Sequence, residues 1–316
     1  MNIDLHCHFV PRNCVDVVDE KGRHYGQDPQ KSVDKKWDDR KWDIASRIKD
    51  MDATGVDMQA ISPSPALFYY DRDPESCLWW SQRLNDGIAE AVKECPSRFI
   101  GLATVPLQDT KLALSEADRA INKLGLRGII IGAHANNHTF DSPEFLPFFK
   151  EIANLDVPVF IHPKGADTGM MAGYHLGNLV GNPLETTLAA ANLIFGGILE
   201  KFPGLKFYLA HAGGNVPYLK GRWEHGYQVR AECKLKISHP PSYYLPLLYF
   251  DTITHSAPAL QYLINEMGSD RVVMGTDYPA DMCEDRPVFM VQSVPGISDG
   301  DRRRILGDNA ARLFKL

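Results

Sequence analysis

The chain opens with MNIDLHCHF, residues 1–9, a β-favouring run that leads directly into two histidines, His6 and His8. Similar apolar runs follow at intervals and predict further strands at 58–62, 99–105, 128–131, 157–162, 206–211, 248–252 and 271–277. Stretches with helical periodicity separate them, at 44–54, 78–95, 111–124, 143–155, 186–202, 216–227 and 257–266. Strands that alternate with helices form a parallel sheet, and eight such strands close a barrel. We therefore predict a (β/α)8 barrel, the TIM barrel.

An open, doubly wound sheet is the alternative architecture, but no GxGxxG sequence follows the first predicted strand. Residues from about 11 to 40 are polar and charged, and they predict a lid-like insertion after strand 1. A second long excursion is predicted at about 228–247. Because no repeat or low-complexity linker interrupts the pattern, we predict that residues 1–316 form a single domain.

Composition excludes several classes of protein. The 316 residues are 44% hydrophobic and 23% charged, with a net charge of −6, and no Lys/Arg-rich run indicates binding to nucleic acid. No apolar stretch approaches the ~18 residues that a membrane span needs. The amino terminus does not resemble a secretory signal, and the six cysteines lack CxxC spacing. These features favour a cytoplasmic enzyme with reduced thiols.

Histidine and aspartate gather at predicted strand ends, where side chains of a barrel enter the active site. His6 and His8 are two residues apart, so on a strand they point to the same side, about 7 Å apart at the backbone. An isolated HxH pair is often structural, but His162 and Asp277 end two further predicted strands. Three imidazoles and one carboxylate suit zinc, with manganese, cobalt and iron as alternatives, and leave a position for water or substrate. We predict one catalytic divalent ion per chain.

His211 ends the sixth predicted strand, within AHAGGN at 210–215. It could serve as a fifth ligand or as an acid/base beside the metal. The second role is favoured because ligands are already provided and because imidazole titrates near neutral pH. A folding core needs no ionisable groups at strand ends, so their concentration here favours an enzyme over a scaffold protein.

Four segments together resemble the amidohydrolase-2 group of the amidohydrolase superfamily. They are DLHCHF at 4–9, FIHP at 160–163, GNPLETTLAAANLIFGGILEKFPGLKFYLAHAGGNVPYLKGR at 181–222 and GTDYP at 275–279. The closest branch is that of the 2-amino-3-carboxymuconate-6-semialdehyde decarboxylases, with γ-resorcylate-type decarboxylases as a related branch. The resemblance implies the barrel, a single-ion site, and His211 as acid/base. It implies the same metal ligands as the strand ends, namely His6, His8, His162 and Asp277.

The resemblance also implies residues that bind substrate carboxylates. Arg222 matches an arginine that enters the active site of the neighbouring subunit in the semialdehyde decarboxylases, which implies a homodimer. Lys35 stands where those enzymes have a second arginine, and an ammonium group is not a bidentate fork. Asn178 replaces a pocket tryptophan, and Ala280 replaces an aromatic residue after GTDYP. These departures imply a related but different substrate.

The predicted activity is therefore non-oxidative decarboxylation of an unsaturated or aromatic carboxylic acid, a small molecule, by a carbon–carbon lyase. Two mechanisms fit this prediction. Either a metal hydroxide, formed with His211 as base, adds to an activated double bond, or His211 or Asp277 protonates the ring carbon of a chelated acid. Arg222 and Lys35 anchor the substrate in both. The alternative is a hydrolase or hydratase that acts on a lactone or an unsaturated diacid with the same metal centre. A non-catalytic barrel that only binds a partner is disfavoured, because such a protein would not need four metal-ligating residues at its strand ends.

Overall fold

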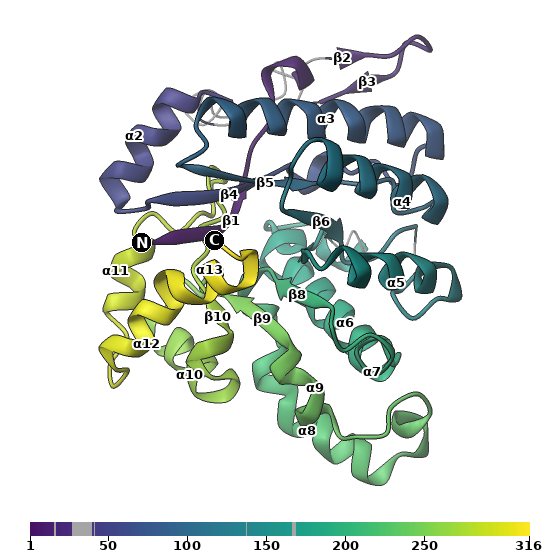
Figure 1. Ribbon diagram of the computed structural model, residues 1–316. Coiled ribbons are helices and arrows are strands. Elements are labelled where there is room, and N and C mark those ends of the chain that lie inside the picture. The colour runs from purple at the N-terminus through teal and green to yellow at the C-terminus, as the bar shows by residue number, and fades with distance from the viewer. Residues whose placement is uncertain (16, 27–39, 41, 137, 166–168) are drawn as a thin grey trace.

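Eight parallel strands form one sheet in the computed structural model (Figure 1), each paired with the next along the chain. The structure describes residues 1–316 except 16, 27–39, 41, 137 and 166–168. The strands are β1 Ile3–His8, β4 Met58–Ser62, β5 Phe99–Ala103, β6 Gly128–Gly132, β7 Pro158–His162, β8 Lys206–Leu209, β9 Leu248–Asp251 and β10 Val272–Val273.

The sheet closes where β1 meets the segment that follows β10. The amide of Leu5 donates to the carbonyl oxygen of Met274 at 2.9 Å, and the amide of Asp277 donates to that of His6 at 2.7 Å. Cys7 and Tyr278 form an isolated parallel bridge one step further along. The predicted (β/α)8 barrel is thereby confirmed, and its closure places the first and last strand ends side by side.

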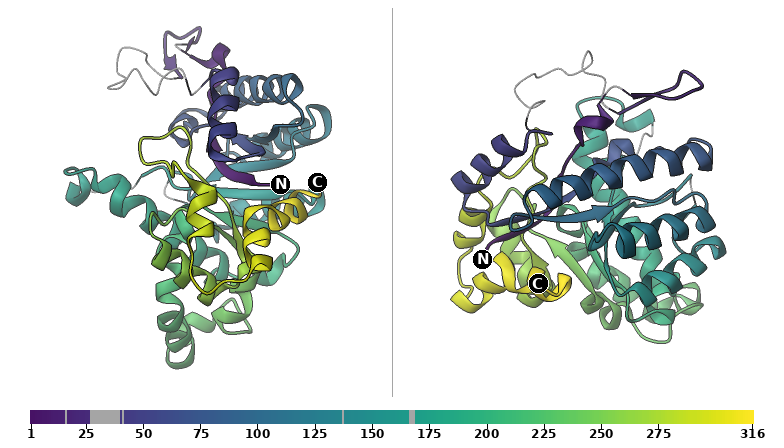
Figure 2. Two further views of the ribbon diagram at one scale, coloured as in Figure 1. Left: turned by 90° about the vertical axis from the view of Figure 1, so that its left-hand side faces the viewer. Right: turned by 45° about the horizontal axis from the view of Figure 1, so that its top comes forward.

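Helices surround the strands in all three views (Figures 1 and 2). They are α2 Ile44–Thr54, α3 Pro74–Glu94, α4 Thr110–Asp118, α5 Leu146–Leu155, α6 Asn182–Phe195, α7 Ile198–Lys201, α8 Val216–Val229, α9 Pro241–Tyr244, α10 Ala257–Met267, α11 Pro287–Gln292, α12 Asp299–Arg303 and α13 Asn309–Phe314. None of these helices is both long enough and apolar enough to cross a membrane.

Two helices differ instructively from the prediction. The helix expected from residue 78 begins at Pro74, because the side chain of Asp73 accepts a hydrogen bond from the amide of Ser76 and proline fits the first turn. The single helix expected at 186–202 is two helices, α6 and α7. Gly197 lies between them with a left-handed φ of 75°, a conformation that ends a helix.

Two of the strands that are shorter than predicted border the candidate site. The run at 206–211 ends as a strand at Leu209, because His211 and Ala212 have φ of 53° and 57° and so leave the extended conformation. The run at 271–277 pairs with β9 only through Val272 and Val273, and its remainder bonds to β1. Both changes turn a strand end into the wall of the active site.

The described part of the predicted insertion after strand 1 packs on α3. It contains a short hairpin of β2 Val17–Val18 and β3 His24–Tyr25, seen beside α3 in Figure 1. The buried ring of Tyr25 lies 5.2 Å from that of Trp80 on α3. This packing forms a small second core, outside the main core of the barrel.

Candidate metal centre

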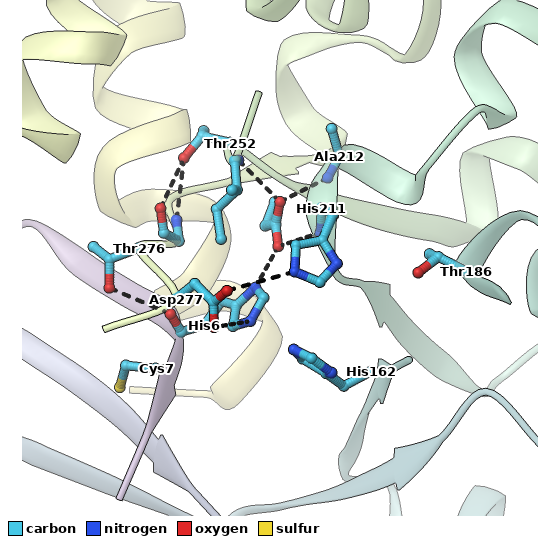
Figure 3. A network of polar contacts seen from close by, with 12 residues as sticks. His6, Cys7, His162, Thr186, His211, Ala212, Thr252, Thr276 and Asp277 are labelled. Carbon is cyan, nitrogen blue, oxygen red and sulfur yellow. Dashed lines mark hydrogen bonds and ion pairs between the residues drawn. The ribbon is translucent and has the colours of Figure 1, made fainter. Parts of the chain in front are cut away.

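His6, His8, His162 and Asp277 come together at the carboxyl ends of the strands. Each offers one ligand atom, and these atoms all lie within 4.8 Å of one another. His6 and His8 belong to β1, His162 ends β7, and Asp277 follows β10. Figure 3 shows His6, His162 and Asp277 converging from these separate strands. The four residues predicted as ligands therefore form one buried cluster.

Each histidine of the cluster is held by a hydrogen bond at Nδ1. These bonds join His6 to Oδ2 of Asp251 (2.6 Å), His8 to Oγ of Ser62 (3.2 Å) and His162 to the carbonyl oxygen of Pro163 (2.6 Å). The other nitrogen of each ring, Nε2, is buried and has no hydrogen-bond partner among the described residues. Buried polar atoms normally have partners. Three such nitrogens beside one carboxylate fit a divalent metal ion, which would be their shared partner.

The charges in the cluster depend on one another. Burial alone would raise the pKa of Asp277, but the charge of His6 and the close contacts of its carboxylate with the imidazoles of His211, His6 and His8 hold that pKa well below its usual range. Burial alone would lower the pKa of His6, yet the nearby carboxylates, Asp277 foremost, raise it to about 10. Burial lowers the pKa of His8, and that of His162 is lowered further by its histidine neighbours. A metal ion must therefore displace a proton from His6.

His211 occupies a sharp turn beside this cluster. Its φ of 53° lies in the left-handed region, which non-glycine residues seldom adopt. Its Nε2 lies 3.6 Å from Oδ2 of Asp277, while Oδ1 of Asp277 lies nearer to His6 and His8, at 3.3 and 3.1 Å from their Nε2 atoms. His211 thus faces the oxygen of Asp277 that is turned away from β1, a position suited to an acid/base next to the metal.

Asp251, which ends β9, joins the first predicted ligand to this turn. Its wholly buried carboxylate receives four hydrogen bonds, from Nδ1 of His6 and from the amides of His211, Ala212 and Ile253. Asp251 lies in a predicted strand but is not among the predicted site residues. The signal that was available is a carboxylate at the end of the apolar run LYFD at 248–251, the same pattern that marked the other strand ends.

A cavity of about 270 Å³ opens beside His211 and Asp277. The polar side chains of its remaining wall are Asn178, Asn182, Asn215, Thr254 and His255. A small carboxylic acid fits such a space, whose wall combines hydrogen-bond donors with Asp277 of the candidate metal centre.

Comparisons with known proteins agree with this geometry. An amidohydrolase family model matches residues 3–316. The chain belongs to the amidohydrolase family. Its relatives within the family include the 2-amino-3-carboxymuconate-6-semialdehyde decarboxylase of Dictyostelium discoideum, to which this amidohydrolase is 36% identical over 330 residues, covering 100% of this chain and 92% of the relative.

Two further decarboxylases are similar to this amidohydrolase. The gamma-resorcylate decarboxylase of a Rhizobium species is 30% identical over 289 residues, 86% of each chain. A crystal structure of a dihydroxybenzoic acid decarboxylase from a Polaromonas species superposes with a TM-score of 0.88 at 27% identity, covering 100% of this chain and 97% of the other. That structure holds manganese and the inhibitor 2-nitroresorcinol.

Of the three residues predicted to contact substrate, only one lies at the cavity within the described part of this amidohydrolase. Asn178 lines the cavity together with His211. Arg222 is exposed on α8, outside the lining of that cavity, and has no hydrogen bond or ion pair with the described residues. Lys35 lies outside the described residues. Within one chain, the structure therefore brings Asn178 to the site and leaves Arg222 away from it.

Proposed function

We propose that this amidohydrolase is a metal-dependent, non-oxidative decarboxylase that acts on an unsaturated or aromatic carboxylic acid. One observation carries the proposal: three buried, unpartnered Nε2 atoms and a carboxylate gather beside His211 and a cavity of about 270 Å³. The full-length similarity to decarboxylases supports the same reaction.

The proposed ligands of one divalent ion are His6, His8, His162 and Asp277. Their nitrogen and oxygen donors make zinc the expected ion, and the manganese in the similar crystal structure supports manganese as the alternative. When bound, the ion would polarise a substrate oxygen as a Lewis acid.

The chain's own residues then handle the proton. In non-oxidative decarboxylation the bond to the carboxyl carbon breaks, its electron pair stays on the substrate, and a proton replaces carbon dioxide. We assign this proton to Nε2 of His211, which lies beside the ligand cluster and lines the cavity. Asp277 is not the proposed donor, because a pKa held well below the usual range keeps its carboxylate ionised, without a proton to give. Its proposed task is to bind the metal and orient His211.

We also propose a homodimer in which Arg222 completes the active site of the neighbouring subunit. Tyr218, one helical turn earlier on the same face of α8, is 80% exposed, and exposed tyrosine and arginine are typical of interface cores. Mixing inactive His211→Ala and Arg222→Ala proteins should restore part of the activity, because one hybrid site has both residues intact. A mixture that stays inactive after subunit exchange would refute the role of Arg222 in the neighbouring site, and a monomeric sedimentation profile would refute the dimer.

The activity is tested with metal-loaded protein and a panel of acids: 2-amino-3-carboxymuconate-6-semialdehyde, 2,6-dihydroxybenzoate and 5-carboxyvanillate. Ultraviolet spectra follow loss of the acid, and a coupled assay measures carbon dioxide. Equal amounts of acid consumed and carbon dioxide released would support the proposal. Consumption without carbon dioxide would instead favour the hydrolase or hydratase. The His211→Ala protein, loaded with the same metal, is the matched control.

A further inference from the structure

A second histidine, His255, lines the cavity beside His211. It lies in the loop between β9 and α10, and its side chain is 43% exposed. Its imidazole makes no hydrogen bond with the described residues, although it lies near one carboxylate. The metal ligands and the proposed acid/base leave this side chain without a task.

The backbone of His255 is strained in the same way as that of its neighbours in the site. Three non-glycine residues of the cavity wall have left-handed φ: His211 at 53°, His255 at 51° and Asp277 at 62°. Such conformations cost free energy and gather at functional sites. Proposed roles account for His211 and Asp277. A turn alone would be formed more favourably by glycine or asparagine. His255 differs from the exposed His175, which has the same backbone conformation, because His255 lies on the cavity wall.

Glu284 holds one edge of this imidazole. Its Oε2 lies 3.9 Å from Nδ1 of His255, and its side chain is only 13% exposed. Glu284 lines the neighbouring cavity and not the one that contains His211. Its amide donates to the carbonyl oxygen of Thr276 at 2.8 Å, which ties it to the residue before Asp277. With Glu284 on the Nδ1 side, Nε2 is the ring nitrogen left for a ligand in the cavity. A ring that carries protons on both nitrogens can donate from Nε2 while Nδ1 faces Glu284.

The rest of the wall has the charge that an anion needs. Among the described lining residues, the only carboxylate is Asp277, at the metal end. The other polar side chains of the wall, besides the two histidines, are neutral and can donate hydrogen bonds, namely Asn178, Asn182, Asn215 and Thr254. An acidic group placed beside His255 therefore meets, among the described lining residues, no carboxylate other than Asp277.

We propose that His255 is a substrate-binding residue that donates a hydrogen bond from Nε2 to a second carboxylate of the substrate. The substrate is then a dicarboxylate, with one acid group at the metal end of the cavity and the other at His255. This inference rests on the proposed decarboxylase and names its substrate class.

The test is calorimetric binding of benzoate, benzene-1,3-dicarboxylate and benzene-1,4-dicarboxylate to the manganese-loaded protein. The wild type should bind at least one dicarboxylate more tightly than benzoate. His255→Asn introduces a residue that tolerates left-handed φ. It should weaken binding of that dicarboxylate about tenfold, as expected for a lost hydrogen bond to a charged group. The affinity for benzoate should change by about twofold or less in the same variant, because benzoate has no second carboxylate to lose this hydrogen bond. His255→Gln, with an amide donor of greater reach, should lose less than His255→Asn.

The matched control is His175→Asn, because His175 is also an exposed histidine with left-handed φ (60°) but lies outside the lining of the cavity. Metal content and melting temperature establish that all variants are folded. The proposal would be overturned if the wild type bound neither dicarboxylate more tightly than benzoate. It would also be overturned if His255→Asn lowered the affinities for benzoate and dicarboxylate by the same factor. Dicarboxylate binding through His255 without carbon dioxide release from any acid tested would refute only the decarboxylase.

Discussion

Asp251→Asn replaces one carboxylate oxygen by an NH2 group at the point where β1, β8 and β9 meet. In the wild type, Oδ2 accepts from Nδ1 of His6 at 2.6 Å and from the amide of His211 at 2.8 Å. Oδ1 accepts from the amides of Ala212 at 2.7 Å and Ile253 at 3.0 Å. The asparagine oxygen can serve only one of these pairs. Whichever way the amide turns, two buried donors lose their acceptor.

The expected cost follows from this count. A buried donor without a partner costs about 1–3 kcal/mol, so two donors predict a loss of about 2–6 kcal/mol in the free energy of unfolding. That is a large share of the ~5–15 kcal/mol by which proteins are usually stable. Metal affinity should also fall about 10- to 100-fold, as for other outer partners of ligating histidines. Asp251 orients both His6 and the His211 turn, so both effects are expected in one variant.

Urea unfolding of the metal-free protein measures the first quantity, and competition with a chelator measures the second. Asp156→Asn is the matched control, because Asp156 pairs with Lys206 and Lys315 at the surface and already has left-handed φ (53°). The Asp156→Asn protein should lose only ~0–1 kcal/mol in the free energy of unfolding, the usual contribution of exposed ion pairs. An Asp251→Asn protein with the wild-type unfolding midpoint and metal affinity would refute the linking role of this carboxylate.

The remaining predictions concern the metal, the proton and one turn. Elemental analysis should find about one divalent ion per chain, and two equivalents would contradict the single cluster. His211→Ala should keep the metal and lose turnover by about 10²- to 10⁴-fold, whereas a metal-free variant would make His211 a ligand. Because the pKa of His6 is raised to about 10, a proton competes with the ion below that pH. Manganese affinity, followed by chelator competition, should therefore rise with pH by up to about tenfold per unit, and a flat profile would contradict this. Gly214→Ala should destabilise by about 2 kcal/mol or more in thermal unfolding, because φ is 63° and a Cβ would lie 2.1 Å from the carbonyl oxygen of Pro183. Gly204→Ala, with nothing within 4 Å of a Cβ, should change stability little, and equal losses in both would contradict the steric argument.

Local sequence signals were sufficient for the barrel and for much of its detail. The helix expected at 44–54 is α2, with the same ends, because Asp43 caps its first turn and Gly55 ends it with a left-handed φ of 74°. Apolar runs identified all eight strands, since a strand buried on both faces needs such a run. That residues 1–316 form one domain, that the protein is cytoplasmic and that zinc is its metal stay predictions.

The candidate ligands could also be found in the sequence, because parallel strands place their carboxyl ends together whatever the intervening length of chain. His6, His8, His162 and Asp277 each end such a run or follow one closely. The resemblance to decarboxylases then narrowed the reaction that this arrangement serves.

Only the tertiary structure decided what surrounds these ligands. The role of Asp251 depends on amides that come from the turn after β8 and from its own loop, and no local pattern encodes those contacts. The early end of β8 at Leu209 has the same origin, since Asp251 holds the turn that redirects His211. His255 likewise gained a role only when the fold placed it on the cavity wall with His211. Periodicity reports which residues are buried within one element, whereas hydrogen bonds and cavity walls are made by side chains from several elements at once.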